Sequence, residues 1–104
     1  MAIIDRHDAA RVSYEDVAAS QTGQVLGATG KTGDILHHLV IIPAATNAGT
    51  IALLDGTVSR NVFVTGTLAD LTPIVVPLGV KSVNGAWSVT TGASVSVIAV
   101  GQFT

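Results

Sequence analysis

The sequence predicts a single all-β domain, a jelly-roll-like or Greek-key β-sandwich preceded by a polar N-terminal arm. Three observations lead to this prediction. The chain has 104 residues, which is the size of one domain. From about residue 22 onward, valine, isoleucine, threonine, serine and glycine dominate, and turn signals recur roughly every eight to twelve residues. The 11 glycines and the many β-branched residues also interrupt every longer helical pattern.

The arm is predicted to span residues 1–21 and the β-sandwich domain residues 22–104. Charge separates the two, because half of the charged residues lie in the first sixteen positions: Asp5, Arg6, Asp8, Arg11, Glu15 and Asp16. The stretch from Asp8 to Ala19 is compatible with a short, poorly capped helix. Apolar residues such as Ile3 and Val12 lie among these charges and favour docking of the arm on a partner over a free tail.

Eight strands are expected in the body of the chain, over residues 24–26, 34–42, 50–54, 57–65, 74–78, 80–83, 86–90 and 94–102. Three runs within them, 39–42, 74–76 and 97–100, are apolar on both faces. Such runs are typical of strands that are covered on both sides. A domain of this size has little second layer to cover them, so a partner subunit is expected to do so.

Two dipeptides predict tight hairpins. Asn84-Gly85 separates residues 80–83 from 86–89, and a type I′ turn there needs positive φ at both positions. That pairing places Ser82 opposite Trp87 and puts the tryptophan on a core face. Asp55-Gly56 predicts a second hairpin in the same way, between residues 51–54 and 57–60.

Composition excludes several classes of function. The net charge is −2 and the five basic residues are scattered, which argues against nucleic-acid binding. The absence of cysteine excludes disulfides, thiol nucleophiles and thiolate metal sites. No stretch approaches the length of a membrane span, and the first residues lack the pattern of a signal peptide. We therefore expect neither a nucleic-acid nor a membrane partner.

No motif in the sequence indicates catalysis. Gly30-Lys31-Thr32 matches the end of a phosphate-binding loop, but Val25 stands where that motif begins with glycine, and a β pattern follows. His37 and His38 are adjacent, so in a strand they point to opposite faces and cannot share a metal ion. Asp34 beside His37 lacks a nucleophile. We expect no catalytic residue, cofactor or metal, and no enzymatic activity.

Part of the chain resembles a known group of proteins. The stretch from Pro77 to Gly101, which includes Asn84-Gly85 and Trp87, resembles the C-terminal half of small virion proteins encoded beside head genes in tailed phages and prophages. The segment Gly27-Ala-Thr-Gly30, followed by Gly33-Asp34, is similar to the start of their β body. The resemblance covers about residues 22–104. It implies a capsid decoration (cement) protein or a related accessory head protein, and it carries over no functional residues.

The expected function is therefore that of a structural virion protein. It would decorate and stabilise a phage capsid by binding the outer surface of the major capsid protein shell, after synthesis in the host cytoplasm. The alternative is a tail or head fibre or adaptor module that binds a host surface or a virion partner. The major capsid protein and further copies of the chain, as a trimer or else a dimer, are the expected partners. The residues expected to bind them are Ile3, Ile4, Arg6, Arg11, Tyr14 and Phe103.

Overall fold

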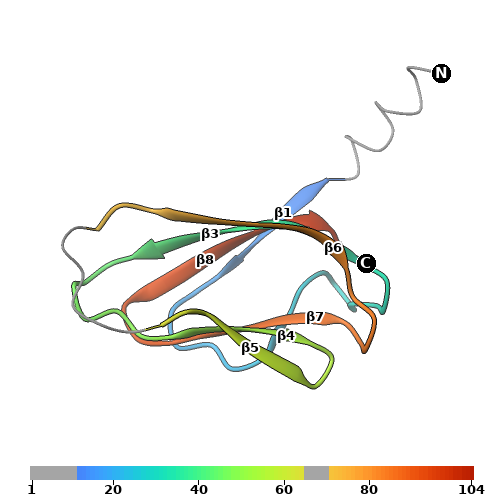
Figure 1. Cartoon of the computed structure of the whole chain (residues 1–104), viewed down its shortest axis with the longest axis horizontal. Coiled ribbons are helices and arrows are strands. Elements are labelled where there is room, and N and C mark those ends of the chain that lie inside the picture. The colour runs from blue at the N-terminus through green and yellow to red at the C-terminus, as the bar shows by residue number, and fades with distance from the viewer. Residues whose placement is uncertain (1–11, 65–70) are drawn as a thin grey trace, which may run out of the picture.

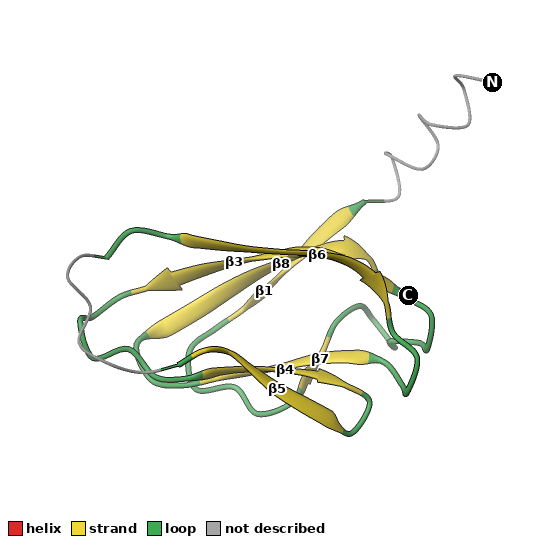
Figure 2. Ribbon diagram, viewed as in Figure 1, coloured by secondary structure: helices red, strands yellow, loops and turns green. Residues whose placement is uncertain are grey.

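The computed structural model describes residues 12–64 and 71–104, which form two antiparallel four-stranded sheets stacked face to face (Figures 1 and 2). The predicted all-β sandwich is confirmed. The strands are β1 (Ser13–Val17), β2 (Gln24–Val25), β3 (Ile35–Pro43), β4 (Ile51–Asp55), β5 (Val58–Phe63), β6 (Ile74–Lys81), β7 (Trp87–Thr91) and β8 (Val95–Gln102).

The pairing of the strands follows a simple rule. The first sheet has the order β1-β8-β3-β6, and the second sheet has the order β2-β7-β4-β5. The first strand pairs with the eighth, the second with the seventh, the third with the sixth and the fourth with the fifth, as in one long hairpin. When this hairpin is rolled up, β8 lies beside β3 and β7 beside β4. This arrangement is a jelly roll.

The core lies between the two sheets and is built by alternation along the strands. In β8, every second residue from Val95 to Gly101 is buried, and in β3 Leu39 and Ile41 follow the same period of two. The second sheet faces them with its own buried side chains, Ile51, Leu53, Trp87 and Val89. The predicted burial of the single tryptophan is thus confirmed.

The short helix with which the stretch from Asp8 to Ala19 is compatible does not form over residues 12–19. Residues 13–17 form strand β1, which pairs with β8 in an unbroken register from Ser13↔Gly101 to Val17↔Val97. Val17 is completely buried, because β1 completes one edge of the first sheet above the core. The sandwich therefore begins at Ser13, inside the segment that the sequence assigns to an arm.

The hairpin predicted at Asn84-Gly85 is also wrong. The strands that it joins, β6 and β7, belong to different sheets, so the dipeptide is a crossover between the sheets. Asn84 does not have the positive φ that a type I′ turn requires. The expected partner of Trp87, Ser82, instead donates its backbone N–H to the carbonyl of Asp34 at 3.0 Å. The two strands expected over 74–78 and 80–83 form the single strand β6, whose pairing with β3 is irregular near Gly79.

The second predicted hairpin, at Asp55-Gly56, is confirmed, with its turn one residue later. Asp55 pairs with Val58, so the turn residues are Gly56 and Thr57. Only Gly56 has a positive φ, which fits a type II′ turn. The Asp55 carboxylate accepts hydrogen bonds from the backbone N–H groups of Val83 and Asn84. These bonds connect the hairpin to the crossover between the sheets.

Candidate binding surface

The outer face of the first sheet is predominantly apolar. Its side chains alternate with the core-facing ones, and the register aligns them in rows that cross all four strands. One row is Tyr14, Val100, His38 and Pro77, and the next is Asp16, Ile98, Val40 and Val75. Ile42 lies beyond them, paired with Ser96. We refer to the apolar members of these rows as the apolar face: Tyr14, Val40, Ile42, Val75, Pro77, Ile98 and Val100.

The fold explains why these side chains come together. The three sequence runs that are apolar on both faces lie in β3, β6 and β8, which are neighbours in the first sheet. Their inner residues fill the core, and their outer residues therefore form one surface. Exposure is highest at the two edge strands, where Tyr14 is 67% and Val75 is 59% exposed. Asp16 is the single charged residue in the two complete rows.

The second sheet has a different outer face. One of its rows is Val25, Ser88, Leu54 and Ser59, and the next is Thr90, Ala52 and Asn61. Hydroxyl and amide side chains provide half or more of each row. Because the two sheets contain similar strands and differ mainly in these outward residues, the apolar character of the first sheet does not follow from the fold alone.

A shallow hollow marks one border of the apolar face. It has a volume of about 460 Å³ and lies along β1 and β8, lined by Val12, Ser13, Tyr14, Asp16, Ile98 and Val100. Aliphatic carbons and the tyrosine ring provide most of this lining, and the Asp16 carboxylate provides the charge. The hollow fits an apolar side chain better than a charged small molecule.

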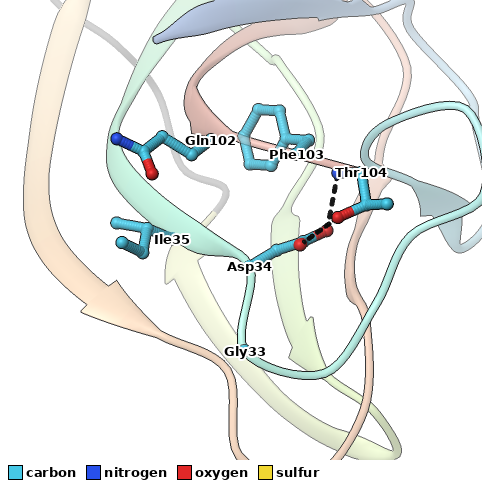
Figure 3. A pocket seen from close by; sticks show the side chains of 6 residues that line it. All are labelled: Gly33, Asp34, Ile35, Gln102, Phe103 and Thr104. Carbon is cyan, nitrogen blue, oxygen red and sulfur yellow. Dashed lines mark hydrogen bonds between the residues drawn. The ribbon is translucent and has the colours of Figure 1, made fainter. Parts of the chain in front are cut away.

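A second pocket, of about 360 Å³, lies at the end of the sandwich where Asp34 precedes β3 (Figure 3). The Asp34 carboxylate is already hydrogen-bonded within the chain, because Thr104 donates its N–H at 2.9 Å and its hydroxyl at 2.6 Å. The Lys31 N–H is a third donor, at 3.1 Å. Asp34 is only 8% exposed. This carboxylate is therefore a structural anchor and not a free acid or base.

The glycine-rich segment before Asp34 also binds Thr104, through the backbone carbonyl of that residue. The carbonyl oxygen of Thr104 accepts the N–H groups of Thr29, at 3.0 Å, and Gly30, at 2.9 Å. The backbone amides that a phosphate-binding loop would direct at a phosphate thus bind part of the chain. The segment does not lead into a helix, because β3 follows it.

The two histidines lie at a β-bulge. Opposite β8, the register shifts between Leu36 and His38, so His37 is the additional residue. Leu36 and Leu39 are both buried, and the two histidines between them are only partly buried, contrary to the simple alternation expected from the sequence. The Nε2 atom of His37 is buried without a hydrogen-bond partner among the described residues.

The structure places two of the residues predicted to bind partners. Tyr14 lies on the apolar face at the edge strand β1. Phe103 is partly buried and packs against the core of its own chain. Ile3, Ile4, Arg6 and Arg11 lie outside the described residues. The apolar residues of β3, β6 and β8 were not predicted as site residues, although their two-sided runs were the signal that could have identified them.

Comparisons with known proteins give no further indication of function. No family model, curated protein or solved structure matches this chain. Over residues 12–64 and 71–104, no three histidine or acidic side chains lie close enough together to hold a metal ion. The same residues include no helix that is long and apolar enough to cross a membrane.

Proposed function

We propose that this chain is a structural virion protein that decorates and stabilises a phage capsid, with no enzymatic activity of its own. It would bind the outer surface of the major capsid protein shell after synthesis in the host cytoplasm. The observation that carries the proposal is the apolar face, a sheet surface that a free domain has little reason to expose. The resemblance of residues 22–104 to small virion proteins supplies the class of partner.

The apolar face suits this role physically. An apolar sheet surface can lie against another protein, and fully burying an exposed valine or isoleucine side chain contributes about 1.5–3 kcal/mol. Charge in the body of the chain is sparse, so few ionic groups need to lose their hydration on binding. Self-association is part of the proposal, as a trimer or, as the alternative, a dimer.

The test is binding to expanded, empty shells assembled from the major capsid protein of the same virus, measured by co-sedimentation. We expect saturable binding with a fixed ratio of chain to capsid protein. Val75→Asp, at an exposed position of the apolar face, should weaken binding at least tenfold, because it introduces a charge into the contact. Ser59→Asp is the matched control, since Ser59 lies on an edge strand and faces outward from the second sheet.

Two results would overturn the proposal. One is the absence of binding to these shells. The other is an equal effect of Val75→Asp and Ser59→Asp, which would show that the apolar face is not the contact. Binding to tail or fibre components, or to host cells, with no affinity for shells would favour the alternative role as a fibre or adaptor module.

A further inference from the structure

The four edge strands of the sandwich differ in how well they are protected against pairing with another strand. Proteins protect such edges with short strands, prolines, bulges and charged side chains. Strand β2 has only two residues, and β6 contains Pro77 and an irregular register. Strand β5 has a bulge at Val62, which has no partner in the register with β4, and it carries the exposed charge of Arg60. Strand β1 has neither proline nor bulge, and its five residues keep a regular register.

The direction in which the backbone groups of β1 point can be assigned from one contact. The carbonyl of Asp16 accepts the side-chain amide of Gln24, which is not part of β8, at 3.1 Å. This carbonyl therefore points away from β8. Backbone groups in an antiparallel strand alternate in direction with a period of two, so the N–H and C=O groups of Tyr14 also face the open edge.

The side chains beside this edge are suited to a protein contact. Tyr14 is 67% exposed, and the hollow between β1 and β8 lies directly beside it. The neighbouring Glu15 carboxylate accepts hydrogen bonds from the Gln24 side chain and the Gly27 N–H, each at 2.8 Å, and keeps its negative charge. Glu15 and Asp16 are the charged residues of β1, so their positions limit how a partner strand can align.

We propose that two copies of this chain pair through β1, antiparallel and about a twofold axis at Tyr14, so that the two first sheets form one continuous sheet. The partner is a second copy because β1 can align with itself without placing like charges opposite each other. This contact is independent of shell binding. It favours the dimer over the trimer and leaves the apolar face free.

Charge selects this register from the two in which Tyr14 lies opposite a residue of β1. Edge-facing residues must meet edge-facing residues, and within β1 these are Tyr14 and Asp16. The second register would bring the two Glu15 residues opposite each other, and like charges in that position are destabilising. The first places Asp16 opposite Val12. It also joins the two apolar faces across the axis.

The chain lacks cysteine, so single-cysteine variants can test the register directly. Opposed residues in a hydrogen-bonded antiparallel pair have Cα atoms about 5.5 Å apart. A disulfide spans about 4.4–6.8 Å between Cα atoms. Under mild oxidation, Tyr14→Cys should therefore yield at least tenfold more disulfide-linked dimer than Ser59→Cys, the matched variant on edge strand β5. Equal yields, or a higher yield from Glu15→Cys, would overturn the proposal.

Sedimentation velocity on the full chain provides a second test without cross-linking. We expect a reversible monomer–dimer equilibrium, and Tyr14→Pro should weaken it at least tenfold. Proline at this position removes an N–H that faces the open edge and not β8, so the circular dichroism spectrum of the fold should be retained. A chain that stays monomeric at high concentration, or an oligomer unaffected by Tyr14→Pro, would overturn the proposal.

Discussion

Asp34 joins distant parts of the chain through both its side chain and its carbonyl group. The carboxylate accepts the N–H and hydroxyl of Thr104, and the carbonyl accepts the indole N–H of Trp87 at 2.9 Å. The sequence suggested Asp34 only as a possible neighbour of His37 in a catalytic pair, and the pattern around it excluded that role. Its structural role was not predictable, because its partners lie 53 and 70 residues away.

Asp34→Ala is expected to lower the free energy of unfolding by about 2–4 kcal/mol, because it leaves several buried or partly buried donors without an acceptor. Urea unfolding followed by Trp87 fluorescence would measure this change. Asp55→Ala serves as a control, since its carboxylate also accepts backbone N–H groups but at an exposed site. It should cost about 1 kcal/mol, like the loss of a helix cap. Equal losses would contradict the anchoring role of Asp34.

Gly56 should be less replaceable than a glycine with the same backbone conformation in open space. Its φ is +63°, and an added Cβ would collide with the carbonyl of Asn84. Gly23 has a φ of +57° and no atom near that position. Gly23→Ala should cost about 1–2 kcal/mol, the penalty of a left-handed conformation. Gly56→Ala should cost at least about 1 kcal/mol more in thermal or urea unfolding, and equal costs would show that the hairpin tip can move away from the crossover.

At the scale of single elements, the sequence predicted strands better than their partners. The Asp55-Gly56 hairpin was predictable because both of its strands remain in one sheet. Asn84-Gly85 has equally strong turn chemistry, but its strands enter different sheets, which local residues do not specify. Strand β1 was missed because Glu15 and Asp16 are poor strand formers. The strand forms because it pairs with β8, which lies some eighty residues further along the chain.

Two truncated chains would distinguish the contribution of β1 to stability from that of the residues before it. Deleting residues 2–11 should leave the stability of the sandwich nearly unchanged, because all of β1 is retained. Deleting residues 2–20 removes the buried Val17 and the ladder to β8, and should lower the free energy of unfolding by at least ~3 kcal/mol. Urea unfolding of both variants would measure this difference. Equal stability of the two truncated chains would contradict the place of β1 in the sheet.

For the whole molecule, the jelly roll depends on contacts between residues far apart in the sequence. Tyr14 pairs with Val100, and each pair of strands outward from the β4–β5 hairpin encloses a longer segment of chain. This nesting also explains why the apolar face could not be predicted as a site. Its three runs were recognisable in the sequence, whereas their positions as neighbours depend on the complete topology.

Folding should accordingly be slow for a chain of this size. All-β proteins dominated by non-local pairing fold in roughly milliseconds to seconds. Stopped-flow refolding from urea, followed by the fluorescence of the single, 6% exposed Trp87, should give a main phase in that range. A main phase in microseconds would show that local contacts guide folding, contrary to the nested pairing.

The pairing of β1 with β8 also determines how the domain responds to mechanical force. Ser13 lies opposite Gly101, so the outer ends of the two strands lie side by side at the same end of the sheet. Tension applied between these ends would peel β1 away from β8, breaking the hydrogen bonds one after another instead of shearing them all at once. We therefore expect the domain to yield at low force when pulled by its two ends. Attachment through a face of a sheet would distribute the load over several strands.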